Sequence, residues 1–203
     1  MESPLCPPDD PGFRLIETLR WEPGRGALRA RQHLARLRRS AEVFGVDASA
    51  AEAALASVAG DGPLRVRLTL DQAGRAEVST APYAPTPEGS VWKVGLAETR
   101  LASEDAWLRH KTTQRALYDS ARASLPGWID EMLFCNEAGA LCEGTITNIF
   151  VPREGALLTP PLSEGLLPEF CARRSWLKGA RARRGSGPRI SGIRSMSETR
   201  CAG

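Results

Sequence analysis

The chain has 203 residues, of which 42% are hydrophobic and 25% charged, and a formal net charge of +3. This composition is that of a globular protein with one domain or two small ones, and it argues against a disordered chain, a coiled coil or a large multidomain protein. No apolar run reaches the roughly 18 residues that a membrane span needs, and the acidic, Pro-rich start lacks signal-peptide character, so we expect a cytoplasmic protein.

Hydrophobic periodicity predicts both strands and helices in the first half of the chain. Alternating apolar and polar residues indicate strands, and apolar residues every three or four positions indicate helices. A helix at 33–44 would place Leu34, Leu37, Ala41 and Phe44 on one face. After a flexible lead-in at 1–12, we expect a strand at 13–21, helices at 33–44 and 50–58, a hairpin of strands at 64–71 and 76–83, and a strand at 91–96. These elements indicate an α+β fold.

The second half is expected to form another subdomain. A polar, loop-like stretch at 100–110 would connect the two subdomains, which we place at 13–105 and 106–168. The segment 157–168, LLTPPLSEGLLP, has the Thr, Pro and Gly pattern of a loop that approaches a ligand closely. The other elements expected here are a helix at 113–124, strands at 129–135 and 140–142 around a turn at 136–139, and a buried strand at 146–151.

The last 35 residues differ from the rest in charge and pattern. Residues 1–168 carry 18 basic and 22 acidic residues, a net charge of −4, whereas 169–203 carry nine basic and two acidic residues, a net charge of +7. This stretch shows no sustained hydrophobic period, so we treat 169–203 as an aberrant basic tail. Since the excess of basic residues is confined to it, nucleic acid is not the expected partner.

Cysteine and histidine usage limits the metal chemistry. The five cysteines are odd in number and form no CxxC pair, so we expect reduced thiols rather than a disulfide framework or a zinc ribbon. Only His33 and His110 are present, and we expect no metal site. Of the 27 basic residues only Lys93, Lys111 and Lys178 are lysines, which draws attention to each of them.

Three features could carry chemistry: Lys111 in RHKTTQR, Glu143 in CEGTITNIF, and the 157–168 loop. Taken alone, each has a simpler interpretation. Lys111 would be a solvated surface lysine and Glu143 a surface or turn carboxylate. Arg36 would be one more basic residue on an Arg-rich helix. Spacing alone does not bring these residues together.

The order of the motifs, however, resembles that of the class IV aminotransferases, which are fold-type IV enzymes that use pyridoxal 5'-phosphate (PLP). Lys111 is followed about thirty residues later by E-G-x-x-x-N-[IL]-F at 143–150, then by L-x-T-P-P at 157–161 and G-L-L-P at 165–168. The resemblance runs from about residue 13 to 168 and includes the early ETLR and H-x-x-R-L segments. It implies two α/β subdomains with PLP in the cleft between them, and a homodimer.

The resemblance also implies roles for individual residues. Lys111 would hold PLP through its amine and move the substrate Cα proton, acting as anchor and general base. Glu143 would keep the pyridine nitrogen of PLP protonated, which strengthens the ring as an electron sink. Arg36 would pair with the phosphate through a charge-assisted fork.

Residues near Glu143 are expected to support the cofactor. Thr147 and Asn148 match positions close to it, as does Thr145, although strand-edge hydrogen bonding explains these residues equally well. Tyr118 lies seven residues after Lys111, on the same side of the expected helix, where packing is its expected role.

The chain departs from the family pattern after Pro168. The family continues with Gly, an aliphatic residue and a turn that contacts the phosphate, whereas here Glu169 follows, whose charge would repel a phosphate. Joining the last base of each codon to the first two bases of the next permits G-V-L-R after L-L-P, and G-N-S-L-R-G across 197–203, as the family pattern requires. We hypothesise that one base was lost near the Pro168 codon, by mutation or sequencing error, and that 169–203 are an out-of-frame translation.

The HKTTxRxxYD sequence at 110–119 most resembles aminodeoxychorismate lyase-like members of the family. We therefore expect a lyase that releases 4-aminobenzoate for folate synthesis from a small-molecule amino substrate, with activity impaired by the altered C-terminus. A class IV aminotransferase of branched-chain or D-amino acids is the alternative, because it would use the same Lys, Glu and Arg. An alternative of another class is a non-catalytic domain whose basic tail binds nucleic acid.

Overall fold

The computed structural model describes residues 5, 7–153, 156–168, 170, 174–176 and 194–197. These residues divide into two compact units. Unit 1 contains the described residues up to Thr86 together with His110–Gln114, and unit 2 contains Pro87–Arg109 and the described residues from Arg115 onward. The expected boundary at 105/106 differs from this division, because the strand after residue 93 pairs within unit 2 and the segment around Lys111 pairs within unit 1.

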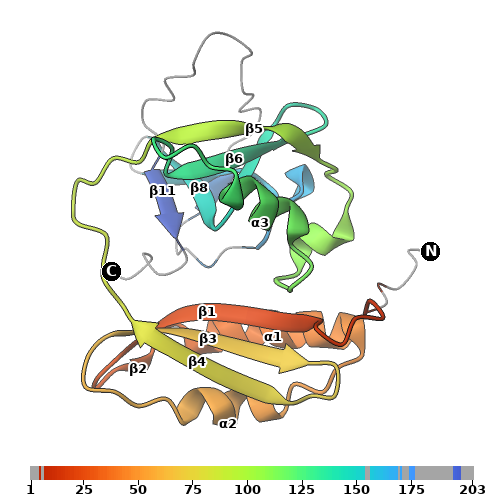
Figure 1. Cartoon of the computed structure of the whole chain (residues 1–203), viewed down its shortest axis with the longest axis vertical. Coiled ribbons are helices and arrows are strands. Elements are labelled where there is room, and N and C mark those ends of the chain that lie inside the picture. The colour runs from red at the N-terminus through yellow and green to blue at the C-terminus, as the bar shows by residue number, and fades with distance from the viewer. Residues whose placement is uncertain are drawn as a thin grey trace. The chain divides into compact units, whose positions relative to one another are not determined.

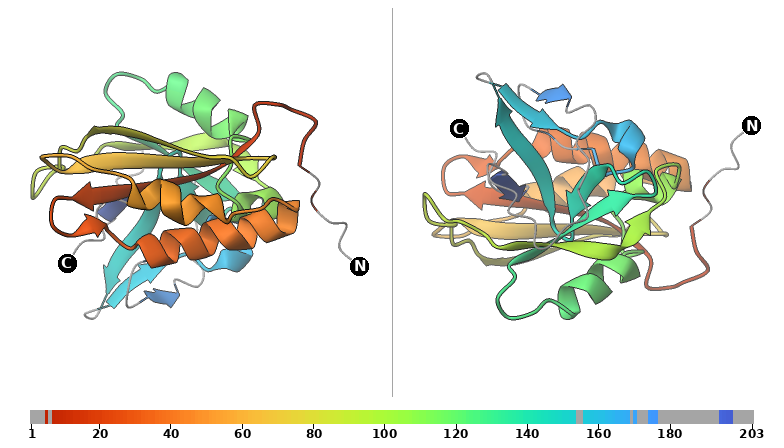
Figure 2. Two further views of the ribbon diagram at one scale, coloured as in Figure 1. Left: turned by 90° about the horizontal axis from the view of Figure 1, so that it is seen from below. Right: turned by 90° about the horizontal axis from the view of Figure 1, so that it is seen from above.

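In the described residues, unit 1 is a four-stranded antiparallel sheet with two helices on one face (Figures 1 and 2). The strands are β1 (Arg14–Glu22), β2 (Gly26–Ala27), β3 (Leu64–Asp71) and β4 (Ala76–Pro82), in the order β2-β1-β3-β4. β1 pairs with β3 from Arg14 opposite Asp71 to Trp21 opposite Leu64. The strand expected at 13–21 and the hairpin expected at 64–83 are therefore present.

Helices α1 (Ala30–Phe44) and α2 (Ala50–Ala56) cover that face of the sheet (Figure 2). The buried side of α1 includes the four apolar residues that the sequence places on one face, Leu34, Leu37, Ala41 and Phe44. α1 lies against β1, so folding removes this stripe from water. The helix ends at Gly45, whose φ of 66° is a left-handed conformation that glycine adopts without steric cost.

Unit 2 is built on a mixed sheet. The strands β6 (Glu131–Asn136), β7 (Leu141–Gly144), β8 (Thr147–Arg153) and β9 (Ala156–Thr159) pair antiparallel in succession. The pairs at the two ends are parallel, β5 (Val94–Leu101) with β6 and β10 (Arg174–Trp176) with β9. The order is β10-β9-β8-β7-β6-β5, with β11 (Arg194–Ser197) paired to β8. Helix α3 (Ala116–Ala123) packs against β6, and short 3-10 helices form at Ala106–Arg109 and Leu162–Glu164.

Two segments differ from their expected structure because of strand pairing. The helix expected at 113–124 begins only at Ala116, because the N–H of Thr113 donates to the Arg14 carbonyl of β1 at 2.9 Å. The segment expected as a loop at 157–168 begins as part of strand β9, which pairs with β8. Prolines follow that strand directly, and their missing N–H groups end the ladder.

The stretch at 91–110 also contains more regular structure than expected. The expected strand at 91–96 starts later, at Val94, and continues to Leu101, which lies opposite Asn136 of the parallel strand β6. The connection that follows contains a 3-10 turn at Ala106–Arg109. Pairing with β6 thus extends the strand into a segment whose polar sequence favours a loop.

Part of the expected lead-in at 1–12 and most of the tail at 169–203 lie outside the described residues. In the tail the structure describes β10, which runs parallel to β9, and β11, which runs antiparallel to β8. The other tail positions on which the reading-frame hypothesis depends fall outside the described part of the chain.

The described residues place some limits on other sites. None of the helices in this part of the chain is both long and apolar enough to cross a membrane. No group of three or more His, Cys, Asp and Glu side chains in these residues is arranged to hold a metal ion. Cys135 and Cys142 are buried free thiols.

Candidate functional site

Lys111 lies on a short segment that extends the sheet of unit 1. The N–H of Ile16 donates to the Lys111 carbonyl at 2.8 Å, and Leu15 and Thr112 form an antiparallel bridge. The Thr113 hydroxyl accepts from the N–H of Arg14 at 2.9 Å. The backbone at Lys111, whose side chain is half-buried, is therefore held to β1 from its carbonyl onward.

The residue before Lys111 ties this segment to helix α1. The His110 Nδ1 and the Ser40 hydroxyl lie 2.9 Å apart, and the His110 ring packs edge-on against Phe44, with centroids 5.1 Å apart. Ser40 lies one helical turn beyond Arg36. The fold of unit 1 thereby links Lys111 and Arg36, two of the predicted site residues, through neighbouring side chains.

Arg36 belongs to a buried cluster with Glu17 of β1 and His33 of α1. The Arg36 Nε donates to Glu17 Oε1 at 2.8 Å and its Nη2 donates to Glu17 Oε2 at 2.7 Å, which is a two-pronged ion pair. The His33 Nδ1 lies 2.7 Å from Glu17 Oε2. All three side chains are at most 3% exposed, so the carboxylate fixes the guanidinium and compensates its charge in the interior.

Glu143 and Asn148 lie opposite each other where β7 pairs with β8 in unit 2. The Tyr118 hydroxyl donates to Glu143 Oε1 at 2.6 Å, and the Leu167 N–H donates to Glu143 Oε2 at 3.0 Å. The Asn148 side-chain amide donates to the Leu167 carbonyl at 3.4 Å. The loop that carries G-L-L-P is thus bonded directly to the two residues that the E-G-x-x-x-N motif contributes.

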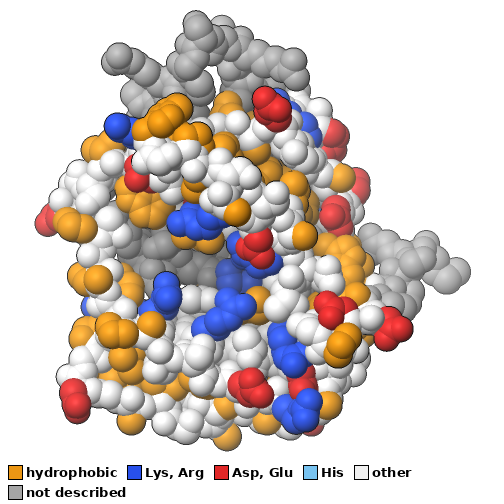
Figure 3. Space-filling view, in the orientation of Figure 1, with side chains coloured by type: hydrophobic (Ala, Val, Ile, Leu, Met, Phe, Trp, Pro, Cys, Tyr) orange, Lys and Arg blue, Asp and Glu red, His pale blue; other side chains and the backbone are white. Residues whose placement is uncertain are grey.

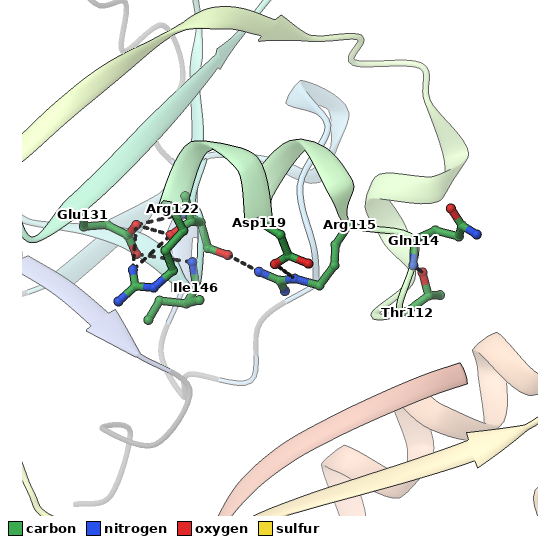
Figure 4. Close-up of polar contacts among 8 residues, drawn as sticks. Thr112, Gln114, Arg115, Asp119, Arg122, Glu131 and Ile146 are labelled. Carbon is green, nitrogen blue, oxygen red and sulfur yellow. Dashed lines mark hydrogen bonds and ion pairs between the residues drawn. The ribbon is translucent and has the colours of Figure 1, made fainter. Parts of the chain in front are cut away.

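The turn between β7 and β8 is organised around Glu131, which is fully buried at the start of β6 (Figure 4). Glu131 Oε1 accepts from both the hydroxyl and the N–H of Thr145, the latter at 3.1 Å. Its Oε2 accepts from the Thr147 hydroxyl at 3.0 Å and from the Ile146 N–H at 3.3 Å. The hydroxyl protons of Thr145 and Thr147 are therefore used to fix the turn, while their oxygens keep acceptor capacity.

Two arginines connect helix α3 to the same turn (Figure 4). The Arg115 Nη2 donates to the Thr145 carbonyl at 2.8 Å while its Nε bonds Asp119 at 2.7 Å. The Arg122 Nη1 lies 3.2 Å from the Thr145 hydroxyl and 3.6 Å from Glu131 Oε1. These contacts join α3 to the turn that precedes Asn148.

Gly144 of the E-G-x-x-x-N motif and Gly165 of the G-L-L-P motif lie where a side chain would not fit. A Cβ on Gly144 would collide with the Thr147 hydroxyl and would lie 3.0 Å from the Glu131 carboxyl carbon. Gly165 has a φ of 79°, and its Cβ would lie 2.8 Å from the Cα of Ser103. Both positions therefore require glycine to keep Glu143 and the G-L-L-P loop where they are.

Burial dominates the protonation of the groups beside Glu143. The pKa of Tyr118 is raised well above its ordinary value, first by desolvation and then by the charge of Glu143, so its phenol stays protonated and remains a hydrogen-bond donor. Desolvation, followed by the charge of Glu143, also raises the pKa of Cys142 to about 12. This thiol is therefore not a reactive thiolate at neutral pH.

The predicted site residues fall into two groups, one in each unit. Arg36 and Lys111 are in unit 1, whereas Glu143, Thr147 and Asn148 are in unit 2. In unit 2 Glu143 and Asn148 lie opposite each other, and in unit 1 Lys111 and Arg36 are linked through the neighbouring side chains of His110 and Ser40.

Neither the role of Glu131 nor the hydrogen bond of Tyr118 was predicted from the sequence. Glu131 is a carboxylate directly before an apolar run, MLFC, and a charge next to a buried strand is a signal of a buried polar contact. Arg115 and Tyr118 belong to the HKTTxRxxYD sequence, and the motif itself therefore pointed to both. The packing expected for Tyr118 is present, because its ring lies edge-on to Phe134 with centroids 5.1 Å apart.

Figure 3 shows acidic, basic and apolar side chains on the described surface of one face, where several basic side chains lie next to one another near the middle of the view.

Comparisons with known proteins agree with the motifs. The family model of amino-transferase class IV matches residues 14–179. A solved structure of a provisionally assigned amino-acid aminotransferase from Mesorhizobium loti is 44% identical, covers 77% of this chain and 79% of its own, and has a TM-score of 0.72. A provisionally assigned 4-amino-4-deoxychorismate lyase is 30% identical over 78% of this chain and 66% of its own, with a TM-score of 0.61.

More distant structures share the fold. A provisionally assigned branched-chain amino acid aminotransferase from Thermotoga maritima is 24% identical, with a TM-score of 0.68, and the match covers 77% of this chain and 59% of that protein. None of the curated proteins matches the sequence. The matches confirm the predicted resemblance and the α+β, fold-type IV class.

Proposed function

Because this chain belongs to the class IV aminotransferase family, and is thus a PLP-dependent lyase or aminotransferase, we propose that it binds PLP through Lys111, Arg36 and Glu143. The side chains suit the cofactor. Arg36 is a guanidinium held in fixed orientation by Glu17, as a phosphate partner should be. Glu143 is a buried carboxylate whose two oxygens are already oriented by donors.

Each residue would contribute a separate function. When bound, PLP withdraws electrons from the bonds at the substrate Cα. The Lys111 Nζ would anchor the cofactor and move the proton at that carbon. The Glu143 carboxylate would hold the proton at the pyridine nitrogen, and Arg36 would bind the phosphate. The side chains of Thr147 and Asn148, which belong to the same hairpin as Glu143, would support the cofactor.

The proposed reaction is that of an aminodeoxychorismate lyase-like enzyme, which eliminates pyruvate and releases 4-aminobenzoate. The observation that carries this assignment is the HKTTxRxxYD sequence, whose Arg115 and Tyr118 contact the turn and the carboxylate of the E-G-x-x-x-N motif. An amino-acid aminotransferase is the second candidate, favoured by the 44% identity to the Mesorhizobium loti protein. We also propose that the protein is cytoplasmic and forms a homodimer.

The first experiment is the visible absorbance of the purified protein with added PLP. We expect a visible band in the wild type that is absent in Lys111→Ala. Lys93→Ala is the matched control, because Lys93 is an exposed lysine of the same chain, and it should keep the band. A band that persists in Lys111→Ala would contradict the proposed anchor, and no band in the wild type would contradict PLP binding by this chain.

A second measurement separates the two candidate reactions. Release of 4-aminobenzoate from aminodeoxychorismate is expected, without a requirement for a keto acid. Amino transfer that depends on a keto acid, with no 4-aminobenzoate formed, would identify the aminotransferase instead. Sedimentation equilibrium of the same preparation tests the homodimer.

The reading-frame hypothesis can be tested with the same absorbance measurement. A chain in which the alternative frame is restored after Pro168 should bind PLP more tightly than the present chain, because Glu169 would be replaced by glycine next to the expected phosphate loop. Equal affinity of the two chains, or several independent genomic reads that keep the present frame, would contradict the hypothesis.

A further inference from the structure

Glu143 is held at both carboxylate oxygens by residues from two other segments of unit 2. One donor is the Tyr118 hydroxyl of α3, at 2.6 Å from Oε1, and the other is the Leu167 N–H, at 3.0 Å from Oε2. Glu143 is 7% exposed, so water competes little for either contact. Hydrogen bonds donated to a buried charged group are strong, and together these two fix the plane of the carboxylate.

Tyr118 is itself rigidly placed. Its ring lies edge-on to Phe134 of β6, and the Arg115 guanidinium lies 5.7 Å from its centroid. Arg115, Tyr118 and Arg122 follow one another at helical spacing on one side of α3, and all three contact the Glu143–Thr147 segment. Desolvation and the charge of Glu143 raise the pKa of Tyr118, so the phenol remains a donor at any working pH.

We propose that Tyr118 is a positioning residue for Glu143: its phenolic O–H fixes one carboxylate oxygen so that, together with the Leu167 N–H, it orients the carboxylate toward the pyridine nitrogen of the cofactor. The inference rests on the proposed function, since it assigns Tyr118 a role in preparing the group that would hold the ring proton. Tyr118 acts through Glu143 and has no assigned contact with the substrate. Preorganisation of this kind avoids reorienting the carboxylate during the reaction.

The test compares Tyr118→Phe with Tyr83→Phe. Phenylalanine keeps the ring that packs on Phe134 and removes only the hydroxyl, and Tyr83 is the one other tyrosine of the sequence. With PLP bound, we expect Tyr118→Phe to lower kcat about tenfold at nearly unchanged substrate KM, because an ordered hydrogen bond to a charged group is worth about that factor. It should also shift the ¹⁵N resonance of PLP labelled at the pyridine nitrogen, whereas Tyr83→Phe should change neither. Wild-type kcat together with an unshifted resonance in Tyr118→Phe would overturn the proposal.

A second experiment tests the contact between Tyr118 and Glu143 without the cofactor. The unfolding equilibrium constants of the wild type, Tyr118→Phe, Glu143→Gln and the double variant form a double-mutant cycle. We expect the double variant to differ about tenfold from the product of the two single effects, since either change alone removes the same charged hydrogen bond. Additive effects would overturn the proposal, because the two side chains would then not interact. If the wild type binds no PLP, the proposed function fails, and this cycle still decides whether Tyr118 holds Glu143.

Discussion

Among the residues that the structure describes, each unit buries one carboxylate almost completely, and these two carboxylates are satisfied in different ways. Glu17 in unit 1 is paired with charge, through the fork of Arg36 and the ring of His33. Glu131 in unit 2 is satisfied mainly by neutral donors, the hydroxyls and N–H groups of the turn at 145–147, and Arg122 lies 3.6 Å away. Their exposed fractions are 1% and 0%, so burial does not distinguish them.

The difference shows what each carboxylate is used for. A carboxylate paired with a cation fixes the cation, and in unit 1 this holds the guanidinium proposed to bind phosphate. A carboxylate surrounded by hydroxyl and amide donors fixes backbone, and in unit 2 this holds the turn between Glu143 and Asn148. One unit therefore orients a side chain and the other orients a hairpin.

The largest effect is expected from breaking the ion pair in unit 1. Glu17→Ala should lower the free energy of unfolding by about 3–5 kcal/mol, because it leaves the buried Arg36 without its carboxylate. Urea denaturation measures the loss. Adding Arg36→Met as a second change should recover much of it, since apolar replacement of both partners removes the uncompensated charge. A loss below about 1 kcal/mol for Glu17→Ala would contradict the charge-paired description.

A smaller effect is expected in unit 2. Glu131→Gln should cost about 1–3 kcal/mol, because the amide keeps one carbonyl acceptor for neutral donors but places an NH₂ group against others. Arg122→Ala is the matched control, with an expected cost below about 1 kcal/mol, since its side chain is 40% exposed. If Glu131→Gln costs less than Arg122→Ala, the neutral donors do not hold Glu131, and the contrast with Glu17 fails.

The sequence predicted the elements whose pattern is local. The apolar stripe of α1 and the alternation of β1, β3 and β4 need no knowledge of partners, and these elements are found where expected. The start of α3 and the end of β5 depend on pairing with distant strands, so local pattern misplaced both. Periodicity contains no information about such partners.

The same limit applies to the candidate site. The family resemblance predicts Arg36, Lys111, Glu143, Thr147 and Asn148 as site residues, whereas spacing alone did not connect them. The side chains that orient them, Glu17 and Glu131 among them, are charged residues within strand sequences. Their partners are 14 to 19 residues away in sequence, and only the fold shows which donors reach them.

The smallest effect is expected from a carboxylate that, like Glu131, holds a turn, but whose charged partner, Arg75, is 77% exposed. Asp71 accepts from the N–H groups of Ala73 and Arg75, both at 2.9 Å, and pairs with the Arg75 side chain. The hydrogen bonds from the Arg75 backbone and side chain lower the pKa of Asp71 below its ordinary 3.8. Its contribution to stability is therefore complete above that ordinary value and is lost as the pH falls through the lower, folded-state pKa.

Asp71→Asn tests this point because asparagine keeps the oxygen that accepts from both N–H groups and removes only the charge. We expect the wild type to exceed the variant slightly in unfolding free energy at pH 7, and the difference to disappear as the pH is lowered through the acid range below 3.8. Urea denaturation of both proteins between neutral and acid pH measures the difference. A constant difference across that range would mean that the charge of Asp71 does not stabilise the turn and that a neutral oxygen at this position is sufficient.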